Sequence, residues 1–96
     1  MTTTEYMETA EELLIHTYNR FKIVLEKGDG VYLYDTDGKK YLDMAAGIAV
    51  FALGYNNKEY NDALKAQVDK LIHTSNLFYN VPATLAAKNI TKASDM

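Results

Sequence analysis

An Asp37-Gly38 step between two alternating runs is the feature that most limits how this chain can fold. One run covers residues 31–35 and the other covers residues 40–43. A tight two-residue turn needs positive φ at its central positions, which Gly adopts freely and Asp tolerates. The pattern therefore predicts an antiparallel hairpin, and residues 21–26, which carry two apolar faces, predict a third strand that completes a meander.

Helical patterns flank the predicted meander on both sides. Apolar side chains recur at helical spacing over residues 4–15, with glutamates between them, so we expect an N-terminal helix. A second helix is expected over residues 58–73, with Asn56 as its cap and a glutamate three positions on completing a capping box. Residues 74–81 are predicted to be extended, and Pro82 is typical of the first turn of a third helix.

Residues 44–53 form a run with no charge and no strong polar group. The run is too short to cross a bilayer and too apolar for an exposed loop, so something must cover it. Residues 77–79, Leu-Phe-Tyr, form a second apolar segment. Two copies of the chain can cover such segments across a two-fold axis, because the same surface then meets itself. We therefore expect a homodimer.

Composition narrows the class of protein further. Ninety-six residues suffice for one small domain with a marginal core. The net charge of −3 and the pI of about 5.2 argue against nucleic acid or an anionic membrane surface as a partner. The absence of cysteine excludes disulfides, thiolate metal sites and cysteine nucleophiles. The Thr- and Glu-rich N-terminus does not resemble a signal peptide, so we expect a cytoplasmic protein.

The acidic residues and histidines do not suggest a reactive cluster. Asp35 and Asp37 are interpreted as turn residues of the hairpin, and Asp43 as a structural residue. His16 and His73 are separated by the whole meander, and no third ligand lies at a suitable spacing. We therefore expect no metal site and no catalytic residue among these 96 residues.

Seven short motifs follow one another along the chain. They are Thr17-Tyr18-Asn19-Arg20, Gly28-Asp29-Gly30, Tyr32-Leu33-Tyr34-Asp35, Asp37-Gly38, Tyr41-Leu42-Asp43, Gly47-Ile48-Ala49-Val50 and His73-Thr74-Ser75-Asn76-Leu77-Phe78-Tyr79. In their order and spacing they resemble the start of the class III pyridoxal-phosphate aminotransferases, over residues 18–96. One segment departs from the family pattern: relatives usually carry Gly-His-x-His-Pro where this chain has Gly54-Tyr55-Asn56-Asn57-Lys58.

The elements together predict an α+β fold, with a helix, a three-stranded antiparallel meander, a helix, an extended crossover and a helix. The resemblance implies that this is the N-terminal segment of a fold-type I aminotransferase. Its parts would be an N-terminal helix and arm (1–20), the meander and apolar run (21–55), a helix and crossover (56–81), and the first helix of the large domain (82–96).

Within the family, the likeness is greatest to the acetylornithine branch. It implies a parent enzyme that moves the amino group of N-acetylornithine to 2-oxoglutarate in arginine synthesis. The parent would bind pyridoxal 5'-phosphate, but the family's Schiff-base lysine, pyridine-nitrogen carboxylate and phosphate-binding Ser-Gly-Thr loop would lie beyond this chain. The chain alone is therefore expected to be inactive and to bind no cofactor covalently. Ornithine, succinylornithine and 4-aminobutyrate aminotransferases remain alternatives, as does a non-catalytic self-associating module.

The resemblance also implies individual site residues. Tyr18 would point into the substrate pocket, where its phenol can donate to a substrate carboxylate. Ile48 would line the pocket at a position that is Tyr in relatives acting on free ornithine, and its apolar side chain suits an amino group masked by an acyl group. Ser75, Asn76, Phe78 and Tyr79 would reach toward the active site of the neighbouring subunit. The structural alternatives are core packing for Tyr18 and Ile48, and a buried extended strand for the other four.

Overall fold

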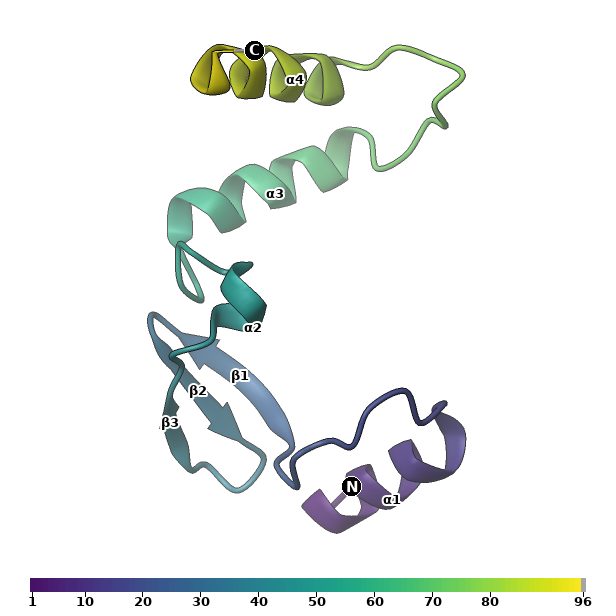
Figure 1. Cartoon of the computed structure of the whole chain (residues 1–96), viewed down its shortest axis with the longest axis vertical. Helices are drawn as coiled ribbons and strands as arrows, with labels where there is room; N and C mark the ends of the chain where they lie inside the picture. Colours follow the sequence, from purple (N-terminus) through teal and green to yellow (C-terminus); the bar gives the residue numbers. More distant parts are fainter. Residues whose placement is uncertain (96) are drawn as a thin grey trace. The chain divides into compact units, whose positions relative to one another are not determined.

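The computed structural model describes residues 1–95, which divide into two units, Met1–Asn61 and the residues from Asp62 onward. The first unit contains α1 (Thr3–Leu13), β1 (Leu25–Asp29), β2 (Tyr32–Asp35), β3 (Lys40–Leu42) and α2 (Ala46–Ala49). Helix α3 (Lys58–Lys70) begins in the first unit and continues into the second, which also contains α4 (Val81–Ser94). Figure 1 traces these elements along the chain. The predicted combination of helices and an antiparallel meander is confirmed.

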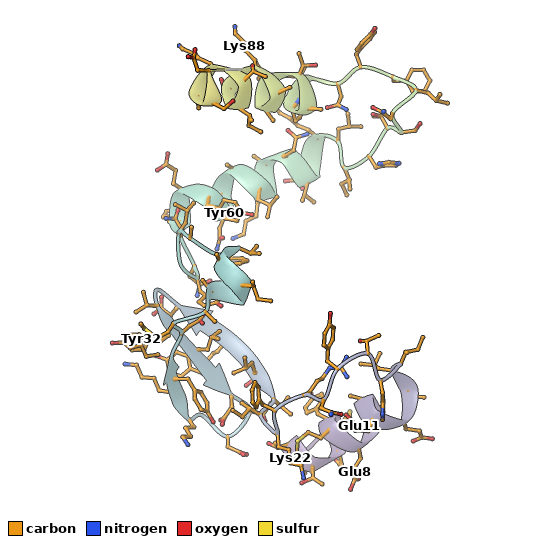
Figure 2. The ribbon with its side chains drawn as sticks, in the orientation of Figure 1. Glu8, Glu11, Lys22, Tyr32, Tyr60 and Lys88 are labelled. Atoms are coloured by element: carbon orange, nitrogen blue, oxygen red, sulfur yellow. The ribbon has the colours of Figure 1, made fainter. Side chains whose placement is uncertain are left out.

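The three strands form one antiparallel sheet in the order β1-β2-β3, with β2 in the centre (Figure 1). Tyr32 pairs with Leu42 across β2 and β3. On this sheet the Nζ of Lys40 lies 3.8 Å from the ring centroid of Tyr32, which is labelled in Figure 2. This cation–π contact helps to fix the β2–β3 register on a surface that offers little burial.

The hairpin forms where it was predicted, but its turn is wider than the two residues expected. Strand β2 ends at Asp35 and β3 begins at Lys40, and of the connecting residues only Gly38 has a positive φ, of 83°. The carboxylate of Asp35 explains the difference: its Oδ1 accepts hydrogen bonds from the amides of Asp37 and Lys39, both at 2.9 Å. These bonds satisfy the loop amides, so a type I′ turn is not required.

Strand β1 lies later in the chain than predicted, at Leu25–Asp29 rather than residues 21–26. The Gly-Asp-Gly motif is therefore largely part of the sheet. Gly30 has φ of 58°, which permits the tight reversal into β2. Its amide donates to the carbonyl of Tyr55 and its carbonyl accepts from the amide of Tyr55, both at 2.8 Å. This bridge, which the sequence pattern did not reveal, ties the segment after α2 to the sheet.

The three longer helices begin with side-chain caps. In α1, Thr2 and Glu5 form a reciprocal capping box. In α3, Asn57 and not Asn56 accepts from the Tyr60 amide, at 2.9 Å, so the predicted cap is wrong by one residue. Asn56 instead has φ of 58° and donates its side-chain amide to the carbonyl of Gly28, at 2.7 Å. The bridge to the sheet therefore decides which asparagine is free to cap the helix.

The connection from α3 to α4 is only partly extended. Helix α3 ends at Lys70, three residues before the predicted end. Ser75 has φ of 64°, and a turn follows at residues 76–77, which interrupts the predicted extended segment. Asn80 then accepts from the Ala83 amide at 2.9 Å and caps α4, with Pro82 in the first turn as predicted.

No side chain among residues 1–95 is buried. The apolar run is a clear case, since Met44 is 86% exposed and Ile48 is 92% exposed. The described helices and sheet therefore do not cover the run. Its coverage by a second copy of the chain stays a prediction.

Candidate functional site

Helix α2 is a single turn with the opposite hand to the other helices. Its four residues, Ala46, Gly47, Ile48 and Ala49, have φ of 51°, 63°, 63° and 62°. The ψ values of Gly47 and Ile48 are 38° and 58°, close to ideal left-handed geometry. We call residues 46–49 the left-handed turn. An L-residue pays about 1–2 kcal/mol in this conformation, and the β-branched Ile48 is an unusual occupant.

The carboxylate of Asp43 caps the start of the left-handed turn. Its Oδ1 accepts from the amides of Ala45, at 3.0 Å, and Ala46, at 2.9 Å. Its Oδ2 accepts from the hydroxyl of Tyr55, at 2.5 Å. The Tyr55 hydroxyl, followed by the Ala46 and Ala45 amides, holds the pKa of Asp43 below its usual value, because all three stabilise the charged carboxylate. The same bond raises the pKa of Tyr55.

The ring of Tyr55 is itself fixed from several sides. It stacks on Phe51, with ring centroids 5.1 Å apart, and Phe51 meets the edge of Tyr60 at 6.5 Å. Tyr60 is labelled at the start of α3 in Figure 2. A Cβ at Gly28 would lie 2.5 Å from Cγ of Tyr55, so the ring occupies the space that a side chain there would need. The backbone bridge, the stacked ring and the bare glycine thus hold the Tyr55 hydroxyl against Asp43.

A second carboxylate–phenol pair lies at the other end of β3. The hydroxyl of Tyr41 donates to Oδ2 of Asp35, at 2.8 Å. Partial burial raises the pKa of Asp35, but hydrogen bonds from the Lys39 amide, the Tyr41 hydroxyl and the Asp37 amide outweigh it, so the pKa is lowered overall. This pair supports the hairpin loop and makes no contact with the left-handed turn among the hydrogen bonds described.

The structure places Ile48 and Tyr18 on exposed backbone within the first unit. Ile48 projects from the left-handed turn, and Tyr18, in the segment between α1 and β1, is 80% exposed. An open hollow of about 740 Å³ lies against the sheet, with Arg20, Phe21 and Asp43 among its lining residues, but neither Tyr18 nor Ile48 lines it. The two side chains are therefore not part of a core in this chain, and their role in a substrate pocket stays a prediction.

The other four predicted site residues lie in the connection between α3 and α4. Ser75 and Asn76 line a hollow of about 290 Å³, together with residues such as His73 and Asn80. Phe78 and Tyr79 are exposed, Tyr79 completely. A buried extended strand, the structural alternative for these residues, is not what the structure shows. The predicted contact of these four residues with a neighbouring subunit stays a prediction.

The two hollows just named lack one side chain that a covalent pyridoxal-phosphate site needs. None of the hollows just named is lined by a lysine, which the cofactor needs for a covalent bond to the protein. Across residues 1–95, no cluster of three or more histidine, aspartate and glutamate side chains is arranged to hold a metal ion. Over the same range, no helix combines the length and apolar character needed to span a membrane.

Sequence reasoning missed the left-handed turn and the part played by Tyr55. Gly47 is the one residue in residues 46–49 that favours positive φ, and a single glycine does not predict four such residues in a row. The signal for Tyr55 was its position in the segment that departs from the family motif. Asp43 was predicted to be structural, and its hydrogen bonds agree with that interpretation.

Comparison with known proteins identifies the family to which this combination of sheet and helices belongs. The model of the class III aminotransferase family matches residues 14–95. The chain therefore belongs to the class III aminotransferase family. Among curated relatives, it is 40% identical over 92 residues to the acetylornithine aminotransferase of Archaeoglobus fulgidus, a match that covers 96% of this chain and 24% of the relative. It is 42% identical over 90 residues to the mitochondrial acetylornithine aminotransferase of Alnus glutinosa, covering 94% of this chain and 20% of the relative.

Solved structures agree with this assignment. The acetylornithine aminotransferase of Elizabethkingia anophelis superposes with a TM-score of 0.88 at 30% identity, covering 97% of this chain and 24% of that one. The taurine:2-oxoglutarate aminotransferase of Bifidobacterium kashiwanohense, solved with PLP and glutamate, gives 0.83 at 26% identity, covering 96% and 21%. An ornithine aminotransferase of Plasmodium yoelii gives 0.90 at 23% identity, covering 99% and 25%, and supports the fold alone. The chain thus spans about a quarter of the length of its relatives.

Proposed function

We propose that this chain forms the N-terminal segment of a cytoplasmic transaminase that uses N-acetylornithine as amino donor and 2-oxoglutarate as acceptor, in arginine biosynthesis. The observation that carries the proposal is the match of residues 14–95 to a family whose similar curated relatives are named acetylornithine aminotransferases. Residues 82–96 would begin the large domain. Pyridoxal phosphate would be bound by the part of the enzyme that this chain does not span, and would supply the electron sink for amino transfer.

Ile48 supports the acetylated donor over free ornithine. A charged δ-ammonium group placed against an apolar side chain would lose its hydration without gaining a partner, which is costly. The acetyl group removes that charge and presents a methyl group to Ile48 instead. The phenol of Tyr18, exposed and without a hydrogen bond that would hold it elsewhere among those described, can donate to a substrate carboxylate.

The proposed enzyme is a homodimer. The exposed apolar run of residues 44–53 and the exposed Phe78 and Tyr79 provide surface for contact with a second copy or with the remainder of the enzyme. In this arrangement Ser75, Asn76, Phe78 and Tyr79 would contact the active site of the neighbouring subunit. The small-molecule partners are then the amino acid and the oxo acid.

A segment exchange tests the proposal. Residues 1–95 replace the matched segment of the Archaeoglobus fulgidus relative, with the unmodified relative as the control. We expect this hybrid enzyme to bind pyridoxal phosphate and to transfer the amino group of N-acetylornithine to 2-oxoglutarate. A hybrid that binds the cofactor and assembles but shows no transfer contradicts the proposal. Faster transfer from ornithine, succinylornithine or 4-aminobutyrate would assign the chain to that branch instead.

The exposed apolar run also favours one alternative of a different class, a non-catalytic module that associates with itself. That function predicts a stable dimer of the 96-residue chain together with an inactive hybrid enzyme. The segment exchange therefore separates the two functions.

A further inference from the structure

We propose that Asp43 and Tyr55 are positioning residues that hold the left-handed turn, and thereby fix the place at which Ile48 meets the acyl-masked end of the substrate. The proposal rests on the function proposed above and adds residues that act through the turn without touching the substrate. The observation behind it is an unusual backbone conformation, in which four consecutive residues have positive φ. Strained backbone of this kind persists only where surrounding contacts hold it, and it concentrates at sites of function.

The strain in the turn is large for so short a segment. Gly47 adopts its conformation at little cost, but Ala46, Ile48 and Ala49 do not. In left-handed backbone each of these three residues brings its Cβ too close to the following carbonyl oxygen, so the turn is strained relative to right-handed backbone. Of the three backbone hydrogen bonds across the turn, those from Ala49 to Ala45 and from Val50 to Ala46 would form equally well in a right-handed turn, and the third is donated by Phe51, which lies after the turn, to the carbonyl of Ala46. The handedness must therefore be imposed from outside residues 46–49.

Asp43 is placed to impose it. Both amides at the start of the turn point at one carboxylate oxygen, which fixes the direction in which the chain leaves β3. The other oxygen is held by Tyr55, which comes after the turn in sequence. The Asp43–Tyr55 contact therefore closes a ring of residues around the turn. Within that ring the Tyr55 backbone is anchored to Gly30, so the closure is tied to the sheet.

The direction of the Ile48 side chain is the property that this arrangement controls. Reversing the sign of φ at Ile48 would swing its Cβ to a different side of the backbone, because the backbone hand sets the Cβ direction. Ile48 is 92% exposed, so packing against its side chain contributes little to holding it in place. Its position is therefore set by the turn, and the turn by Asp43 and Tyr55.

Two matched variants separate positioning from general support of the fold. Tyr55→Phe removes the hydroxyl that holds Asp43, and Tyr41→Phe removes the equivalent hydroxyl from the Asp35 pair at the opposite end of β3. Both substitutions delete one phenol–carboxylate hydrogen bond, one beside each end of β3. Only the first is connected to the left-handed turn.

The first measurement is made by NMR on the 96-residue chain. Positive φ brings the Hα and amide proton of one residue close together, so Ile48 should give a strong intraresidue NOE. We expect Tyr55→Phe to weaken this NOE at least about twofold and Tyr41→Phe to leave it unchanged. An NOE that is weak in the unmodified chain, or equal in the two variants, overturns the proposal without reference to enzymatic activity.

The second measurement uses the hybrid enzyme with its cofactor. We expect Tyr55→Phe to lower the ratio of kcat/KM for N-acetylornithine over ornithine by roughly 3- to 10-fold, and Tyr41→Phe to leave the ratio within about twofold. Asp43→Ala should lower the ratio further than Asp43→Asn, because the amide oxygen of Asn can still accept from the turn. Equal losses for both substrates in Tyr55→Phe would show a merely structural role and overturn the proposal. An unmodified hybrid that binds the cofactor and assembles but shows no transfer refutes the proposed function, and the NOE then decides the positioning separately.

Discussion

Replacing Gly28 with alanine should loosen the contact between the Tyr55 segment and the sheet. A Cβ at position 28 would lie 2.5 Å from Cγ and 2.8 Å from Cβ of Tyr55, where an ordinary carbon–carbon contact is about 3.5–4.0 Å. The added methyl group therefore needs a movement of about 1 Å. The ring cannot supply it by rotating a distant atom, because the overlap is with the base of the Tyr55 side chain.

Overpacking by one methyl group costs about 1–3 kcal/mol. The alanine recovers about 0.4–1 kcal/mol by restricting the unfolded chain, since Gly28 does not have the positive φ that would add backbone strain. The net loss for Gly28→Ala is therefore centred on about 1.3 kcal/mol, which corresponds to a roughly 9-fold change in the opening equilibrium. Hydrogen exchange at the Tyr55 amide, which donates to the Gly30 carbonyl, reports this opening directly.

The matched control is Gly38→Ala in the hairpin loop. Gly38 has φ of 83° and open space around it, so alanine there adds backbone strain but no clash and lies away from the bridge. We expect Gly38→Ala to leave exchange at the Tyr55 amide unchanged. Equal exchange rates in Gly28→Ala and the unmodified chain would refute the reasoning, because they would show that the ring gives way freely.

Three further predictions concern the whole chain. Asp35 and Asp43 have lowered pKa values in the folded chain, so the stability they contribute is complete above their unfolded pKa of about 3.9 and is lost as the pH falls through their pKa values in the folded chain. The protection factor of the Tyr55 amide, which is its intrinsic exchange rate divided by the observed rate, should therefore fall below about pH 4, and a protection factor that does not change with pH would contradict this. The 96-residue chain should self-associate at tens of micromolar in light scattering coupled to size exclusion, whereas a compact monomer that binds no hydrophobic dye would refute the role given to residues 44–53. The same chain mixed with pyridoxal phosphate should show no borohydride-sensitive aldimine absorption and no turnover of N-acetylornithine.

Prediction from the sequence succeeded for elements that depend on local turn and cap preferences. It failed for elements whose position is set by contacts between distant residues. The Asp37-Gly38 hairpin, the meander order and the Pro82 helix start follow from turn and cap preferences, and all three are present. The position of β1 and the cap of α3 were wrong for a common reason. Gly30 and Tyr55 bridge across 25 residues, which extends β1 to Asp29 and engages Asn56 with the Gly28 carbonyl.

The site was predictable only in part. The prediction that Ile48 lines the pocket came from the resemblance to a family. No local sequence pattern indicates that Ile48 lies on a left-handed turn. Three of the four residues in that turn disfavour positive φ, so propensity argues against the conformation. It depends instead on Asp43 and Tyr55, whose contact joins residues twelve positions apart. The role of the exposed apolar residues in the site could not be predicted either, because it depends on surfaces outside a single copy of this chain.

The most direct test of the account is the substrate preference of the hybrid enzyme with and without Ile48→Tyr. A tyrosine there replaces the apolar contact proposed for the acetyl methyl group with a polar hydroxyl, which favours the free amino group of ornithine. We expect the ratio of kcat/KM for N-acetylornithine over ornithine to fall roughly 5- to 150-fold. This corresponds to a difference of about 1–3 kcal/mol in transition-state free energy between the two substrates. An equal ratio in the hybrid enzyme with and without Ile48→Tyr would contradict the assignment of Ile48 to the substrate pocket. It would also contradict the proposal that the left-handed turn positions Ile48 there.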